Sequence, residues 1–214
     1  MQEIEELSAG GSVRMRGPLK FGRLSISGSL KIDSSAEGEE LHVSGSGSIS
    51  GDLRVRELKV SGSMNIKGSL EGDEVSISGS TSVDEELKCG ELEVSGSLKA
   101  CKVVATEVAI NGSLRASEVL AKEVVIGRKS KVFAKVIARE VRVGKEAEVS
   151  EVIGGEVGVG KNAEVDLIEG EYVSVAKNAE VGVLRYVNRA DIDERAEVDK
   201  LVKIEKLSRE IPSQ

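Results

Sequence analysis

The tripeptide Ser-Gly-Ser returns every 17 residues through the first half of this chain. Each copy follows two apolar residues separated by one position, as Leu58 and Val60 precede Ser61. The copies are Ser44-Gly45-Ser46, Ser61-Gly62-Ser63, Ser78-Gly79-Ser80 and Ser95-Gly96-Ser97. A period this short predicts a solenoid, because so small a unit buries its apolar face only by stacking on neighbouring copies.

The repeat extends over most of the 214 residues, in steps of 17 and later also of 16. If the first apolar residue marks the start of a copy, there are twelve copies, and they begin at Leu7, Leu24, Leu41, Leu58, Val75, Leu92, Val108, Val124, Val141, Val157, Val173 and Ala190. Early copies turn at Ser-Gly-Ser, whereas later copies turn at sequences such as Gly144-Lys145-Glu146-Ala147. The two types meet near residues 108–124 without a recognisable linker.

Within each copy the apolar residues alternate by two, which is typical of strands with one buried face. Three short strands per copy, separated by corners, predict an all-β fold: a parallel β-helix, or β-solenoid, of about twelve coils of 16–17 residues. Steps of 16 and 17 do not fit the three hexapeptides of a left-handed coil, so we expect the right-handed form. The expected organisation is a short N-terminal tail over 1–6, the β-helix over 7–204 and a short C-terminal tail over 205–214.

Composition narrows the classes of function. The net charge is −7, aromatic residues make up 2% of the chain, and neither a basic cluster nor an aromatic platform is visible, so we do not expect a nucleic-acid partner. No apolar run approaches the ~20 residues of a membrane span. The opening residues MQEIEE lack the features of a signal peptide, so the expected location is cytoplasmic, without membrane association.

No residue pattern predicts catalysis. Gly155 with Gly160-Lys161 resembles part of a phosphate-binding loop, but Asn162 stands where such a loop needs Ser or Thr, and a strand is expected to follow. His42 is the single histidine, which excludes a metal site built on several histidines of one chain. Cys89 occupies a repeat position that is otherwise apolar and is read as a buried hydrophobe. The sequence therefore predicts a protein that is not an enzyme, with no catalytic, cofactor-binding or metal residues, no cofactor and no small-molecule substrate.

Two columns of polar residues follow from stacking. One glutamate precedes each of eight copies, and coils about 4.8 Å apart would align these carboxylates, with Lys122 and Arg139 nearby to offset their charge. The column is interpreted as a solvated corner, with weak Ca²⁺ or Mg²⁺ association as the alternative. For the Ser-Gly-Ser column we expect a structural role, in which glycine permits the bend and serine satisfies backbone groups.

The alternating apolar pattern and its glycine corners, as in Val141-Arg142-Val143-Gly144-Lys145, resemble the bactofilins, a family of polymer-forming cytoskeletal proteins. The resemblance covers roughly residues 7–204. It implies a right-handed triangular β-helix that assembles end to end into filaments without nucleotide.

The two ends of the repeat are the predicted functional surfaces, because an open β-helix leaves unpaired strand edges there. The expected partner is a second copy of the chain, and the predicted function is a structural one, as a cytoskeletal filament or scaffold. The predicted polymer interface comprises Val13, Met15, Leu19, Phe21, Val198, Leu201, Val202 and Ile204. The alternative is a non-polymerising binding or scaffold module, capped by its C-terminal segment as a short helix over Leu201 to Ile211.

Overall fold

The chain folds into short parallel β-strands, and the predicted all-β solenoid is confirmed. A computed structural model describes residues 2–212, which contain strands and turns but no helix. The strands form a β-solenoid of about twelve coils. The chain comprises two compact units, Met1–Val104 and Ala105–Gln214, and their boundary lies just before the region where the two corner types meet. The right-handed sense of the coil stays a prediction.

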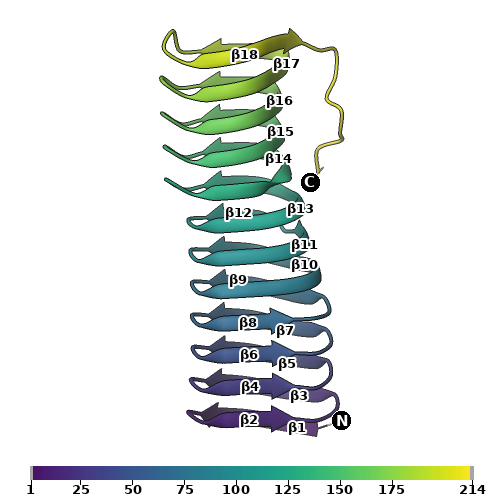
Figure 1. The fold of residues 1–214 in the computed structure, drawn as a ribbon. Coiled ribbons are helices and arrows are strands. Elements are labelled where there is room, and N and C mark those ends of the chain that lie inside the picture. The colour runs from purple at the N-terminus through teal and green to yellow at the C-terminus, as the bar shows by residue number, and fades with distance from the viewer. Residues whose placement is uncertain (1, 213–214) are drawn as a thin grey trace. The chain divides into compact units, whose positions relative to one another are not determined.

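The first unit is built from strands that pair in parallel with the equivalent strands of the next coil (Figure 1). Register follows the 17-residue step, so that Leu24 pairs with Leu41 and Leu41 with Leu58. Its strands are β1 (Gln2–Ala9), β2 (Ser12–Met15), β3 (Leu19–Ile26), β4 (Ser29–Ile32), β5 (Ala36–Val43), β6 (Ser46–Ile49), β7 (Leu53–Val60), β8 (Ser63–Ile66), β9 (Leu70–Ile77), β10 (Ser80–Val94) and β11 (Ser97–Val104).

The second unit has fewer and longer strands, because several continue around a corner. They are β12 (Glu107–Ile110), β13 (Ser113–Ile126), β14 (Lys131–Val143), β15 (Glu148–Val159), β16 (Glu164–Val175), β17 (Glu180–Ile192) and β18 (Glu197–Lys203). From β12 to β18 each strand pairs in parallel with the next.

The core of each unit is a stack of aliphatic side chains at alternate strand positions. In β7, Leu53, Val55, Leu58 and Val60 are at most 1% exposed, and the residues between them face outward. Each such side chain contributes about 1.5–3 kcal/mol on burial, which explains how a core nearly free of aromatic residues holds together. Cys89 belongs to this core, and burial raises the pKa of its thiol to about 12.

The Ser-Gly-Ser corners hold successive coils at very close range. A Cβ added at Gly62 would lie 1.9 Å from the carbonyl oxygen of Gly45, although the backbone of Gly62 is not left-handed. The amides of Ser61 and Ser63 donate to the carbonyls of Val43 and Gly45. Glycine is therefore needed for close approach between coils rather than for the bend, and neighbouring backbone, not serine hydroxyls, satisfies these corner amides.

The corners of the second unit contain residues with a left-handed backbone conformation. Lys129, Glu146, Asn162 and Asn178 occupy the same corner position, with φ between 55° and 60°. The residue after each of them is buried: Ser130, Ala147, Ala163 or Ala179. The Ser130 hydroxyl donates to the carbonyl of Ile110 at 3.0 Å. A left-handed residue thus turns the chain so that a small side chain can enter the core.

The coil limits differ from the sequence prediction at both ends. Strand β1 begins at Gln2 and pairs with β3, so residues 2–6, predicted as a tail, belong to the first coil. The helix expected over Leu201 to Ile211 is wrong, because Leu201 lies in β18 and residues 204–212 form bends and irregular chain.

Candidate functional site

The first coil presents an open edge formed by β1 and β2. These strands pair with β3 and β4, and in the described part of the first unit no strand pairs with their other side. The inward side chains of Ile4 and Leu7 are therefore partly exposed, whereas their partners one coil further, Phe21 and Leu24, are 3% and 0% exposed. Such an edge offers both backbone hydrogen bonds and an apolar layer to another strand.

The predicted N-terminal interface residues fall in two different coils. Val13 and Met15 lie in the first coil, where Val13 is partly exposed and Met15 is 8% exposed. Leu19 and Phe21 lie in the second coil, paired with Gln2 and Ile4 of β1. The sequence prediction did not place Ile4 in the first coil, although its spacing of 17 residues from Phe21 indicates that it belongs there.

The last coil presents the matching open edge in the second unit. Strand β18 pairs with β17, and within the described residues of this unit no strand pairs with its other side. Leu201 is 51% exposed, whereas its partner Leu184 is fully buried. Val198 is likewise partly exposed, and its partner Val181 is 2% exposed.

The other two predicted C-terminal interface residues, Val202 and Ile204, lie at different positions of the coil. Val202 pairs with Arg185 and belongs to an outward column of side chains, so it does not extend the core. The amide of Ile204 donates to the carbonyl of Tyr186 at 2.9 Å, and the strand pairing of the last coil ends there. Ala190 and Ile192 at the end of β17 also lie on the open edge, and the sequence prediction omitted them.

After Ile204 the chain runs back along the side of the second unit (Figure 1). We call residues 205–212 the C-terminal strap. The amide of Ser208 donates to the Glu169 carboxylate in β16. Ile211 lies over β15, where a Cβ added at Gly155 would be 3.6 Å from its Cδ1. The described strap therefore lies on a lateral face and leaves Leu201 exposed.

The strap leaves the coil where the repeat fails. Leu207 stands 17 residues after Ala190 and would begin the next copy. The next inward position, two residues on, is Arg209. Burying an unpaired guanidinium in an aliphatic core is strongly unfavourable, so the coil ends here and the chain takes a lateral path.

Beneath the strap lies an outward column with unusual burial. Leu120, Ile137, Ile153, Glu169 and Arg185 pair successively across β13 to β17. Ile137 and Ile153 are 2% and 0% exposed although they point away from the core, and Glu169 is 1% exposed. Arg185 Nη1 lies 3.6 Å from Glu169 Oε2. The column is thus an apolar strip that ends in a buried carboxylate, which lies close to Arg185 and accepts a hydrogen bond from the Ser208 amide of the strap.

The glutamate column is confirmed by the register in each unit. In the first unit Glu40, Glu57, Glu74 and Glu91 pair successively, and in the second Glu107, Glu123, Glu140 and Glu156 do so. Among the described residues, the lysine and arginine side chains paired with these carboxylates are Arg23, Arg56, Lys59 and Arg142 rather than Lys122 and Arg139.

Hydrogen bonding to these cations changes the acidity of the column. The bond from Arg23 holds the pKa of Glu40 below its ordinary value, and the bond from Lys59 does the same for Glu57. His42 Nε2 lies 3.8 Å from Glu57. Among the described residues there is no group of three or more His, Cys, Asp or Glu side chains placed to hold a metal ion.

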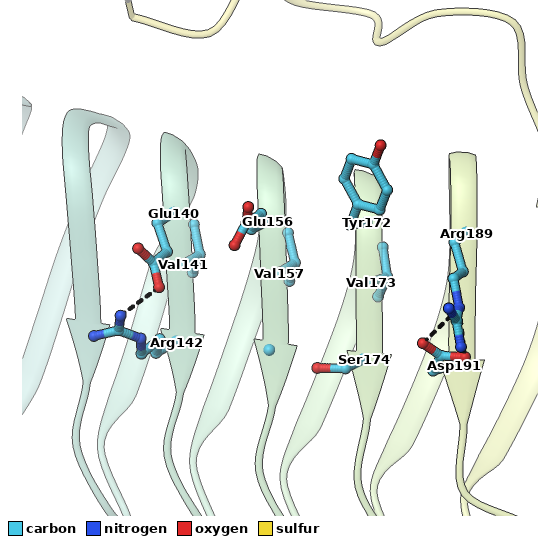
Figure 2. Close-up of a pocket in the computed structure, with 11 residues that line it drawn as sticks. Glu140, Val141, Arg142, Glu156, Val157, Tyr172, Val173, Ser174, Arg189 and Asp191 are labelled. Atoms are coloured by element: carbon cyan, nitrogen blue, oxygen red, sulfur yellow. Dashed lines mark hydrogen bonds and ion pairs between the residues drawn. The ribbon is translucent and has the colours of Figure 1, made fainter.

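A shallow hollow of about 480 Å³ lies beside this column in the second unit (Figure 2). One wall is formed by Glu140, Glu156, Tyr172 and Arg189 on successive strands. The other wall is formed by Arg142, Gly158, Ser174 and Asp191. Ion pairs between the walls, Glu140–Arg142 and Arg189–Asp191, close its two ends (Figure 2).

The segment that resembles a phosphate-binding loop is an ordinary corner. Gly155 lies within β15, Gly160 to Asn162 form the turn, and β16 follows where such a loop needs a helix. No helix in the described residues is long and apolar enough to cross a membrane.

Comparison with protein-family models, with curated proteins and with solved structures finds no match for this chain. The family resemblance read from the repeat is therefore carried by the sequence pattern alone.

Proposed function

We propose that this protein is a structural protein that assembles end to end into nucleotide-independent filaments or scaffolds, as its resemblance to the bactofilins implies. The observation that carries the proposal is the pair of open strand edges, β1–β2 in the first unit and β17–β18 in the second. Both edges expose aliphatic side chains at the positions that all the coils between them bury. Pairing one edge with the other in a second copy satisfies backbone groups and covers that layer.

The two edges carry residues from matching positions of the repeat. Leu7 and Ala9 correspond to Ala190 and Ile192 at the start of a copy. Val13 and Met15 correspond to Ala196 and Val198 after the corner. In our proposal each pair stacks as consecutive coils do within a unit, so the junction needs no new type of contact.

In such a junction, one strand of each copy competes for the same position. Residues 2–4 and 201–203 both form the strand that precedes a copy start, so a continuous junction has room for only one of them. Because Leu19 and Phe21 lie beneath residues 2–4, they reach the interface only when residues 2–4 move aside. Removing residues 2–5 is therefore expected to strengthen assembly rather than to abolish it.

The capped, non-polymerising module has less support. A cap would have to cover Leu201, Val198 and the edge of β18, but the described strap lies against β15 and β16 instead. The lateral path of the strap favours an accessible end.

Electron microscopy of the purified protein, together with sedimentation over a range of concentrations, tests the proposal. We expect threads that lengthen with concentration and do not require ATP or GTP. Leu201→Glu should shorten them strongly, because it places a carboxylate in the junction. Val125→Glu is the matched control, since Val125 is 38% exposed on an outward column beside Arg142 and away from either open edge.

Circular dichroism of both variants verifies that the coils remain folded. A monomer of constant size at all concentrations would contradict the proposal. Equal thread lengths for Leu201→Glu and the wild type would also contradict it.

A further inference from the structure

The hollow of Figure 2 contains a glycine that the fold does not require. A Cβ added at Gly158 would meet Ser174 Oγ at 3.6 Å and the carbonyl oxygen of Val141 at 4.0 Å, which are ordinary contacts. Its backbone is not left-handed. By contrast, a Cβ at Gly154 or Gly160 would approach other atoms within 3.0 Å. Glycine weakens a strand by roughly 0.5–1 kcal/mol relative to alanine, so a glycine inside β15, one residue before the strand ends, points to close approach by a ligand.

The carboxylate beside this glycine has no internal partner. Glu156 is exposed, and among the described residues it makes no ion pair or side-chain hydrogen bond. Its column neighbour Glu140 is bound by Arg142 at 2.5 Å. The gap at Gly158 explains the difference, because Arg142 occupies the equivalent outward position one coil earlier. One wall of the hollow therefore offers an unneutralised negative charge.

An aromatic ring stands next to this carboxylate. Tyr172 pairs with Glu156 in the adjacent strand and is 51% exposed (Figure 2). A tyrosine ring attracts cations placed over its face, by about 0.5–1 kcal/mol at exposed sites. The ring and the carboxylate thus favour the same type of ligand, and the small side chains of Gly158 and Ser174 leave room for its alkyl portion.

We propose that this hollow binds an organic cation, namely a primary ammonium or guanidinium group carried on a short alkyl chain. The carboxylate of Glu156 forms an ion pair with the cationic group, and the ring of Tyr172 lies against the same group. The alkyl chain occupies the space over Gly158. The cation comes either from a free amine or from a lysine or arginine side chain of a protein partner. A single exposed site of this kind predicts millimolar affinity, and repeated copies in an assembly would raise the avidity.

NMR titration of the protein, with assigned backbone amides, tests this inference. The probes are cadaverine, Nα-acetyl-lysine methylamide and Nα-acetyl-arginine methylamide, with Nα-acetyl-norleucine methylamide as the neutral control. We expect saturable shifts of the amides near Gly158 and Tyr172 with the cationic probes and none with the norleucine probe. Tighter binding of cadaverine than of the amino-acid amides would identify a free amine as the source, and the reverse order would identify a side chain.

Three variants locate the site. Glu156→Gln should weaken binding about tenfold, and Gly158→Val should abolish it by filling the hollow. Glu164→Gln is the matched control, because Glu164 is exposed in β16 and does not line the hollow. Loss of binding in the control, or equal binding by Glu156→Gln and the wild type, would overturn the proposal. Unchanged self-assembly in Gly158→Val would separate this site from the end-coil junction.

Discussion

The two units share the same outward column of the coil, but its residues are exposed in one unit and buried in the other. In the first unit this column alternates in charge, through Lys20, Glu37, Arg54 and Glu71, with Arg54 and Glu71 joined at 2.7 Å. In the second unit it holds the buried Ile137, Ile153 and Glu169, and the strap is hydrogen-bonded to Glu169. Outward positions do not contribute to the core, so a repeat can change its lateral surface without changing its fold.

The corners differ in the same way. In the first unit a Cβ at a corner glycine such as Gly62 would lie 1.9 Å from a carbonyl oxygen. At Gly144 and Gly160 of the second unit the nearest atom would be 2.6 and 2.7 Å away, and these later corners also contain left-handed residues with side chains. In the second unit Ala176 even stands where Gly144 and Gly160 stand in earlier copies. The first unit therefore depends more strongly on glycine.

The largest expected effect concerns these corners. Gly62→Ala should destabilise the protein by about 3 kcal/mol or more, because its Cβ would lie 1.9 Å from a backbone oxygen that cannot move aside freely. Gly160→Ala should cost about 1 kcal/mol, since the next copy already accommodates alanine at this position. Urea unfolding of both variants measures the difference. Equal losses would contradict the contrast between the two corner types.

The second effect concerns the covered strip. Ile153→Lys gives the second unit a charge like those of the first and should displace the strap, with a loss of about 2–3 kcal/mol. Trypsin should then cleave more rapidly after Lys206 and Arg209. Phe133→Lys serves as the control, because Phe133 is already 41% exposed. Strap cleavage at the wild-type rate in Ile153→Lys would show that the strip does not hold the strap.

Substitution of the buried carboxylate Glu169 should have a smaller effect on stability. Glu169→Ala leaves Arg185 and the Ser208 amide without their acceptor and should cost about 1–3 kcal/mol. Glu169→Gln keeps an acceptor for the amide and should cost less. Hydrogen exchange at Ser208, compared in the two variants, reports on the strap directly. Faster exchange in Glu169→Gln than in Glu169→Ala would contradict this role of the carboxylate.

A stabilising change is expected at a left-handed corner. Lys129 has a φ of 60°, and glycine adopts this conformation without strain. Lys129→Gly should therefore raise the unfolding free energy by up to about 1 kcal/mol. Lys145→Gly is the control, because Lys145 is not left-handed and should only lose stability. A thermal melt of each variant distinguishes the two.

The smallest effect is a pH dependence in the first unit. The hydrogen bond from Arg23 lowers the pKa of Glu40 below 4.5, so this carboxylate stabilises the fold above its unfolded pKa. The contribution is lost as the pH falls through the folded pKa. Arg23→Gln should make the decline of stability below about pH 4.5 shallower. An unchanged acid-unfolding curve would show that the pair does not contribute.

The sequence alone determined the coil, because a strict spacing of inward aliphatic residues leaves only one way to bury them. Register within each unit, the alignment of the glutamates and the buried position of Cys89 all follow from that period. The first coil could have been extended to Ile4 by the same reasoning, since Ile4 keeps the 17-residue spacing.

Only the tertiary structure decided what covers the outward positions. The apolar residues Ile137 and Ile153 interrupt a column of charges and were visible in the sequence, but nothing there indicated their partner. The strap reaches this column through contacts between residues far apart in the chain, as between Ser208 and Glu169. Local alternation specifies which way a side chain points, whereas the path of a non-repeating segment depends on the whole surface that the finished coils create.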